Sequence, residues 1–97
     1  MKKLATALAT TLCLTACSHP ELDGASLAQD KGCVTCHGLN GEATAPNYPH
    51  LNIQWERYLR VELLRYKNGE RNNAIMNGMA AQLTDDEIRA LAKHYGI

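Results

Sequence analysis

The sequence predicts an all-α domain with three main helices joined by long loops. Several segments carry apolar residues at intervals of three and four, the spacing that lines one face of a helix. No stretch of any length alternates apolar and polar residues in the way that is typical of a half-buried strand. We find neither an internal repeat nor a low-complexity run, so one domain accounts for the chain after its leader.

The chain begins with a segment that resembles an export leader. Two lysines and then a short run of apolar or small residues, Leu4 to Ala16, have the form of a secretory signal peptide. This run is too short to remain in a bilayer as a spanning helix. It ends in Leu14-Thr15-Ala16-Cys17, which resembles the lipobox of bacterial lipoproteins, where cleavage precedes a cysteine that then carries lipid. An ordinary signal peptide, cut somewhere between Ala16 and Pro20, is the alternative.

We therefore expect a signal peptide at 1–16, a lipid-anchored tether at 17–23 with lipid on Cys17, and a folded domain at 24–97. The protein would be exported and attached to the membrane on its periplasmic side. Without Lys2 and Lys3, the chain has eight basic residues against ten acidic ones, a balance that argues against nucleic acid as a partner.

The first helix of the domain is expected from Gly24, with Ala25, Leu27 and Ala28 as packing positions. Soon afterwards comes Cys33-Val34-Thr35-Cys36-His37. C-x-x-C-H is the attachment signature of a c-type haem, in which the thiols bond to the porphyrin and the histidine ligates the iron. Cysteines three residues apart on a helical turn face the same way, toward one edge of the macrocycle.

Two other uses of a C-x-x-C pair are a redox dithiol and half of a zinc site. A thioredoxin-like pair would need a βαβ pattern around it, and a zinc site would need a second pair of ligands at metal spacing; the sequence has neither. One covalent haem c is the predicted cofactor. A domain this small usually needs a stabilising cross-link in addition to its core. A haem bonded at both thiols and at the iron would provide it.

Residues 38–49 are expected to form a loop that contains Pro46 and Pro49. A ligating histidine usually donates its second ring N–H to a carbonyl or carboxylate, which fixes the orientation of the ring. We assign this role to the carbonyl of Pro46.

The next helix is predicted at about residues 53–67. Trp55, Leu59, Leu63 and Tyr66 repeat at four, four and three residues and form one stripe. Asn68-Gly69 is a good C-terminal stop, because both residues tolerate the left-handed conformation.

Residues 71–83 are interpreted as a loop that carries Met76 and Met79, both candidates for a second axial ligand. Met79 is close to Leu83, which belongs to the packing of the following helix. Met76 lies farther out, where Asn77-Gly78 would allow the chain to turn toward the haem. We therefore favour Met76.

The last helix has the clearest boundary in the chain. Thr84-Asp85-Asp86-Glu87 is a capping box, and Leu83 and Ile88 stand at the hydrophobic staple positions. An apolar stripe follows at helical spacing and ends before Gly96; it comprises Ile88, Leu91, Ala92 and Tyr95.

Together these residues resemble the small bacterial class I cytochromes c, especially the single-haem modules of dihaem periplasmic cytochromes. The resemblance extends from Gly24 to Gly96. It rests on Gly24-x-x-Leu27, Gly32-Cys33-Val34-Thr35-Cys36-His37-Gly38, Pro46-Asn47-Tyr48-Pro49-x-Leu51, Tyr66-x-x-Gly69-x-Arg71, Met76-x-Gly78-Met79-Ala80 and Leu83-Thr84-Asp85-x-x-Ile88. It implies an apolar haem pocket, crossed first and last helices, His37 as proximal ligand with Pro46 as its carbonyl partner, and Met76 as distal ligand.

The expected function is one-electron transfer in a periplasmic respiratory chain, between redox partner proteins and without enzymatic activity. One alternative is a haem module or subunit of a larger respiratory complex. Another is a peroxidase or gas-binding protein with an open sixth site, which would need a distal acid or base. His50 and His94 could supply one, but we expect both to be surface or structural residues.

Overall fold

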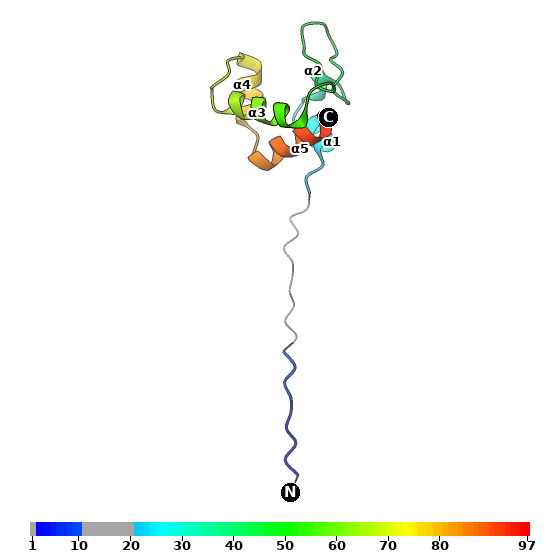
Figure 1. Cartoon of the computed structure of the whole chain (residues 1–97), viewed down its shortest axis with the longest axis vertical. Coiled ribbons are helices and arrows are strands. Elements are labelled where there is room, and N and C mark those ends of the chain that lie inside the picture. The colour runs from blue at the N-terminus through cyan, green and yellow to red at the C-terminus, as the bar shows by residue number, and fades with distance from the viewer. Residues whose placement is uncertain (1, 11–20) are drawn as a thin grey trace.

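The computed structural model describes residues 2–10 and 21–97. These residues contain helices and no strand, which confirms the all-α prediction. The helices are α1 (Gly24–Asp30), α2 (Val34–His37), α3 (Glu56–Lys67), α4 (Ala74–Ala81) and α5 (Asp85–Tyr95) (Figure 1). Within the described ranges, no helix combines the length and the apolar character needed to cross a bilayer. Cys17 and the lipobox lie outside the described residues, so their assignment stays a prediction.

The first and last helices of the domain cross at Gly24. Asp23 caps α1 by accepting a hydrogen bond from the Ala25 N–H at 3.2 Å. A Cβ atom on Gly24 would lie 2.2 Å from the Ala90 carbonyl oxygen and 2.6 Å from Cβ of His94. Only glycine therefore allows α1 to approach the backbone of α5 this closely.

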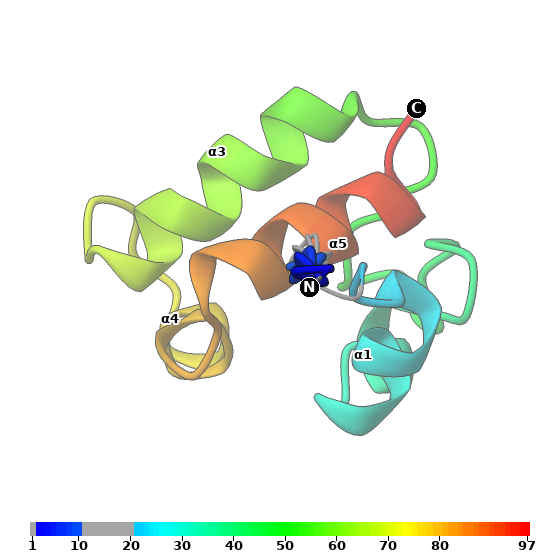
Figure 2. The same ribbon diagram turned by 90° about the horizontal axis from the view of Figure 1, so that it is seen from below.

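Helix α5 forms the centre of the core and packs against α3 as well as α1 (Figure 2). Its predicted capping box is present, with Glu87 N–H donating to Thr84 Oγ1 at 3.1 Å and Thr84 N–H to Glu87 Oε1 at 3.0 Å. Both staple residues, Leu83 and Ile88, are buried. The buried core comprises Ala28, Leu59, Leu83, Ile88, Leu91, Ala92 and Tyr95. The predicted stripe of α5 is thus confirmed.

Helix α3 begins later than predicted, and Trp55 does not belong to its apolar stripe. Trp55 has extended backbone angles at the N-cap and its side chain is 74% exposed. The chain at the start of α3 pairs instead with Ile97, which follows α5: Glu56 N–H donates to Ile97 O at 3.0 Å, and Ile97 N–H to Gln54 O at 2.9 Å. Leu59 is the buried member of the stripe.

The prediction of a loop over residues 71–83 was wrong, because α4 occupies most of this segment. Asn73 caps the helix by accepting a hydrogen bond from Met76 N–H at 3.1 Å. Asn77 and Gly78, expected to form a turn, both lie inside the helix. Gly78 does not break the helix. A single glycine lowers helix stability by about 1 kcal/mol relative to alanine, and the packing of the neighbouring turns outweighs this cost.

Candidate cofactor site

The two cysteines and the histidine of the C-x-x-C-H motif lie on one helical turn. His37 N–H donates to Cys33 O at 3.0 Å, and Gly38 N–H to Val34 O at 2.9 Å. Cys33, Cys36 and His37 all line the same cavity. Both cysteines therefore face the same way, as their spacing of three residues predicts.

Cys33 and Cys36 are both partly buried, and burial raises the pKa of the Cys33 thiol. A thiol in a redox dithiol pair normally has a lowered pKa, because the thiolate is its reactive form. Cys33 has the opposite environment, a partly buried position in an apolar wall. This setting suits a sulfur that is bonded to a cofactor better than one that exchanges disulfides.

His37 is buried and its ring is oriented by the loop that follows. Nδ1 lies 3.0 Å from the carbonyl oxygen of Pro49 and must donate to it. This leaves Nε2 as the ring nitrogen that can bind a metal. A histidine held in this way is the arrangement expected of an axial ligand.

The prediction that Pro46 supplies this carbonyl was wrong. Pro46 lies in an exposed turn closed by a hydrogen bond from Tyr48 N–H to Ala45 O at 3.1 Å. Pro49 follows where the chain returns to the domain, just before Leu51 N–H donates to Gly41 O at 2.7 Å. The loop contains both Pro46 and Pro49, and residue spacing alone could not show which of their carbonyls faces His37.

The same loop is bonded directly to α2. Thr44 N–H donates to Cys36 O at 3.0 Å, and Thr44 Oγ1 donates to Thr35 O at 2.8 Å. At the start of the loop Gly38 has a φ of +76°, and a Cβ atom there would lie 2.2 Å from Glu42 O. The α2 side of the cavity is therefore fixed by contacts with the loop that follows it.

The cavity has a volume of about 450 Å³, within the usual range of small-molecule and cofactor sites. Its walls come from α2, α3, α4 and α5 and are mainly apolar. Besides the C-x-x-C-H residues, it is lined by Lys31, Gly32, Thr35, Leu51, Leu59, Glu62, Leu63, Ile75, Met76, Met79, Leu83, Leu91, Ala92 and Tyr95. Two thiols, an oriented imidazole, thioethers and an apolar shell form a donor set that fits a covalently bound haem.

Both candidate methionines reach this cavity. Met76 and Met79 are three residues apart on α4, so they share a face of the helix. The terminal methyl of Met79 lies 3.8 Å from the position that a Cβ atom on Gly32 would take. Met79 is thus next to the residue that precedes Cys33, at the edge of the cavity where the motif begins.

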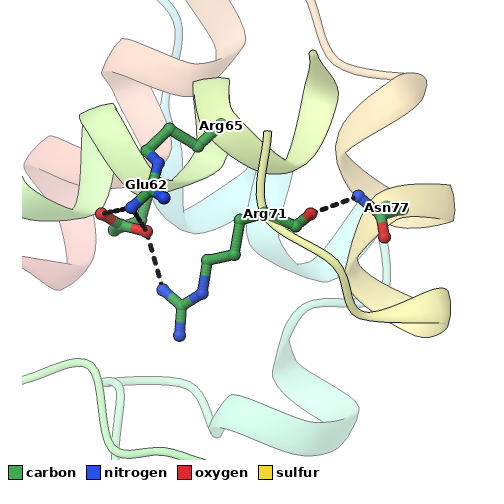
Figure 3. A network of polar contacts seen from close by, with 4 residues as sticks. All are labelled: Glu62, Arg65, Arg71 and Asn77. Atoms are coloured by element: carbon green, nitrogen blue, oxygen red, sulfur yellow. Dashed lines mark hydrogen bonds and ion pairs between the residues drawn. The ribbon is translucent and has the colours of Figure 1, made fainter. Parts of the chain in front are cut away.

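A charged cluster centred on Glu62, which lines the cavity, was not foreseen from the sequence. Glu62 accepts hydrogen bonds from Arg65 Nη1 at 3.0 Å and from Arg71 Nη1 at 2.8 Å (Figure 3). Burial alone would raise the pKa of Glu62, but the hydrogen bonds from Arg71 and Arg65 outweigh it and hold the pKa low. Only the i, i+3 spacing of Glu62 and Arg65 could have indicated this pair.

His50 and His94 have structural roles, as expected. His50 Nδ1 accepts from the Ala43 N–H at 2.8 Å, and His94 Nε2 donates to Leu39 O at 2.9 Å. Neither is among the residues that line the cavity.

Comparison with known proteins gives consistent matches. The family model described as cytochrome c matches residues 22–94. Cytochrome c4 of Pseudomonas aeruginosa is 36% identical over 98% of this chain and 48% of its own length. Cytochrome c-554(548) of Halomonas halodenitrificans is 40% identical over 73% of this chain and 92% of its own length. A thiosulfate dehydrogenase electron acceptor of Thiomonas intermedia is 42% identical over 65% of this chain. The chain spans about half the length of the cytochrome c4 that it matches.

Proposed function

The chain belongs to the cytochrome c family, and we propose that it carries single electrons between redox partner proteins on the periplasmic side of a membrane. The family's cofactor is a covalently bound haem c, whose iron supplies the redox chemistry by cycling between the ferric and ferrous states. One observation carries the proposal: the same apolar cavity is lined by two thiols, a buried imidazole and two thioethers.

Each of these residues has a distinct part in the proposal. Cys33 and Cys36 hold the haem through thioether bonds, and Nε2 of His37 is the proximal iron ligand. Pro49 keeps the imidazole in the tautomer that leaves Nε2 free. Met76 is the distal ligand, and His/Met ligation raises the reduction potential of electron-carrying cytochromes.

The contacts of Met79 support the choice of Met76. Because the Met79 methyl packs beside Gly32, this side chain fills space at the edge of the cavity. Met76 lies one turn nearer the start of α4, where its own N–H is bonded to the Asn73 side chain. A defined backbone position of this kind suits a residue that must present its sulfur to a metal.

The test compares Met76→Ala with Met79→Ala. We expect Met76→Ala to abolish the weak charge-transfer band near the red end of the visible spectrum, to lower the potential and to allow CO to bind the ferrous protein. Met79→Ala should keep the band and mainly reduce stability, by less than the roughly 2–5 kcal/mol lost when a fully buried methionine is truncated, because Met79 is only partly buried. Loss of the band in Met79→Ala alone would reverse the assignment.

Membrane attachment through Cys17 is the second part of the proposal. The lipobox-like Leu14-Thr15-Ala16-Cys17 supports it, and a lipid chain contributes about 0.8 kcal/mol for each buried CH₂ group. Cys17→Ser should move the protein from the membrane to the soluble periplasmic fraction after osmotic shock. Wild-type protein recovered in that soluble fraction would contradict the anchor.

A haem module of a larger respiratory assembly is the second candidate function. It is favoured by the cytochrome c4 match, in which the aligned segment is 48% of the relative's length. Co-purification of the solubilised protein with an oxidoreductase complex would support this reading. A monodisperse protein that exchanges electrons with several partners would support a separate carrier, in keeping with the relatives named as electron acceptors.

A further inference from the structure

The side chain of Asn77 joins three segments of the chain. Its amide nitrogen donates to Tyr66 O and to Arg71 O, both at 2.8 Å (Figure 3 draws the second bond). Its amide oxygen accepts from the Asn73 N–H, also at 2.8 Å. One side chain therefore uses three of its four hydrogen-bonding positions on backbone groups.

These three bonds determine how α4 sits against α3. Tyr66 O belongs to the last turn of α3, where carbonyls have no partner within the helix. Arg71 O belongs to the connection between the helices, and Asn73 is the N-cap of α4. Because a single planar amide contacts all three, it fixes the position and the rotation of the first turn of α4.

Met76 lies within that first turn. Asn77 follows it directly, and the Asn73 side chain accepts the Met76 N–H at 3.1 Å. Asn73 is itself held by Asn77, so the backbone of Met76 is fixed on both sides. The same amide is linked through Arg71 to Glu62, which lines the cavity.

We propose that Asn77 is a positioning residue that holds the Met76 thioether in place as the iron ligand. This inference rests on the proposed function, in which Met76 is that ligand. A thioether is a neutral and weak ligand, so small displacements of its backbone are enough to release it. Breaking the bonds of Asn77 would allow the first turn of α4 to rotate or fray, and the sulfur would move with it.

The principal variant is Asn77→Asp, which has nearly the same shape. It keeps the oxygen that accepts from Asn73 and loses both donor bonds, to Tyr66 O and Arg71 O. Asn77→Ala removes all three bonds and serves as a second variant if the new carboxylate prevents folding. The matched controls are Asn72→Asp and Asn72→Ala, since Asn72 is exposed in the same connection and outside this network.

The readouts are taken on holoprotein that far-UV circular dichroism shows to be folded. We expect the Asn77 variants to lose at least half of the intensity of the methionine charge-transfer band. We also expect their ferrous forms to bind CO at least tenfold faster than wild type, while the Asn72 variants behave like wild type. A role in helix stability alone would lower the unfolding midpoint without changing either signal in the folded protein.

Three outcomes decide the inference. Loss of the band in the Asn77 variants, with the Asn72 variants unchanged, supports it. An unchanged band and unchanged CO binding in folded Asn77 variants overturn it and leave the assignment of Met76 intact. A Met76→Ala protein that keeps its band overturns the ligand assignment itself, and the positioning role with it, so the two failures are distinguishable.

Discussion

The Tyr95 hydroxyl donates a hydrogen bond to the carbonyl oxygen of Gly38 at 2.9 Å. Gly38 directly follows His37, so this bond joins the last turn of α5 to the end of the haem-binding motif. Tyr95 is 5% exposed and also lines the cavity. Burial raises the pKa of Tyr95 to about 12.

The pH dependence of stability follows from this raised pKa. The fold favours the neutral hydroxyl, so its contribution is fully present below the ordinary tyrosine pKa of about 10 and is lost as the pH rises toward about 12. Tyr95→Phe should lower the free energy of unfolding by about 1 kcal/mol at neutral pH. The same substitution should also remove part of the decrease in stability between pH 10 and 12. Denaturant unfolding of both proteins across that range measures the effect, and parallel profiles would contradict it.

Pro49 should control the mobility of the His37 ring. Pro49→Gly keeps the carbonyl but frees the backbone, which should lower the free energy of unfolding by about 1 kcal/mol. The His37 Nδ1–H should then exchange faster with solvent, as followed by NMR of the holoprotein. Pro46→Gly is the matched control: it should cause a similar loss of stability and leave the exchange rate unchanged. Equal acceleration in both variants would refute the assignment of Pro49.

Gly24 should tolerate substitution less well than Gly78, the other glycine within a helix. Gly24→Ala places a Cβ atom 2.2 Å from the Ala90 carbonyl oxygen, and backbone cannot move aside as a flexible side chain can. We expect a loss of about 1–3 kcal/mol in the free energy of unfolding. Gly78→Ala, with no atom within 4 Å of the added Cβ, should be neutral or stabilising by up to about 1 kcal/mol. Thermal unfolding of the two variants tests the contrast.

Local signals predicted much of the fold. The capping box at Thr84, the stripe of α5 and the helical turn of the C-x-x-C-H motif depend on residues within one or two turns of each other. The structure reproduces all three. Trp55 was misassigned because residues 54–56 pair with Ile97 at the far end of the sequence, a contact that no local pattern encodes.

Two other differences have physical causes of their own. Met76, Met79, Ala80 and Leu83 do have helical spacing, and Asn73 is a favoured N-cap residue, so α4 was predictable in principle. Asn77 and Gly78, which lie inside the helix, lowered its apparent helix propensity and hid it. The bonds of Asn77 and the choice of Pro49 over Pro46 depend on how the chain folds back on itself, and residue spacing does not specify this.

The claim that this haem transfers electrons with two protein ligands on its iron can be tested by an optical redox titration of the purified holoprotein under CO. We expect a reversible one-electron transition, with low-spin six-coordinate spectra in both states and no CO adduct when reduced. The haem should stay with the protein in acid–acetone. A ferrous form that becomes high-spin or binds CO would contradict the claim, because it would reveal an open coordination site of the kind that a gas-binding protein or peroxidase requires.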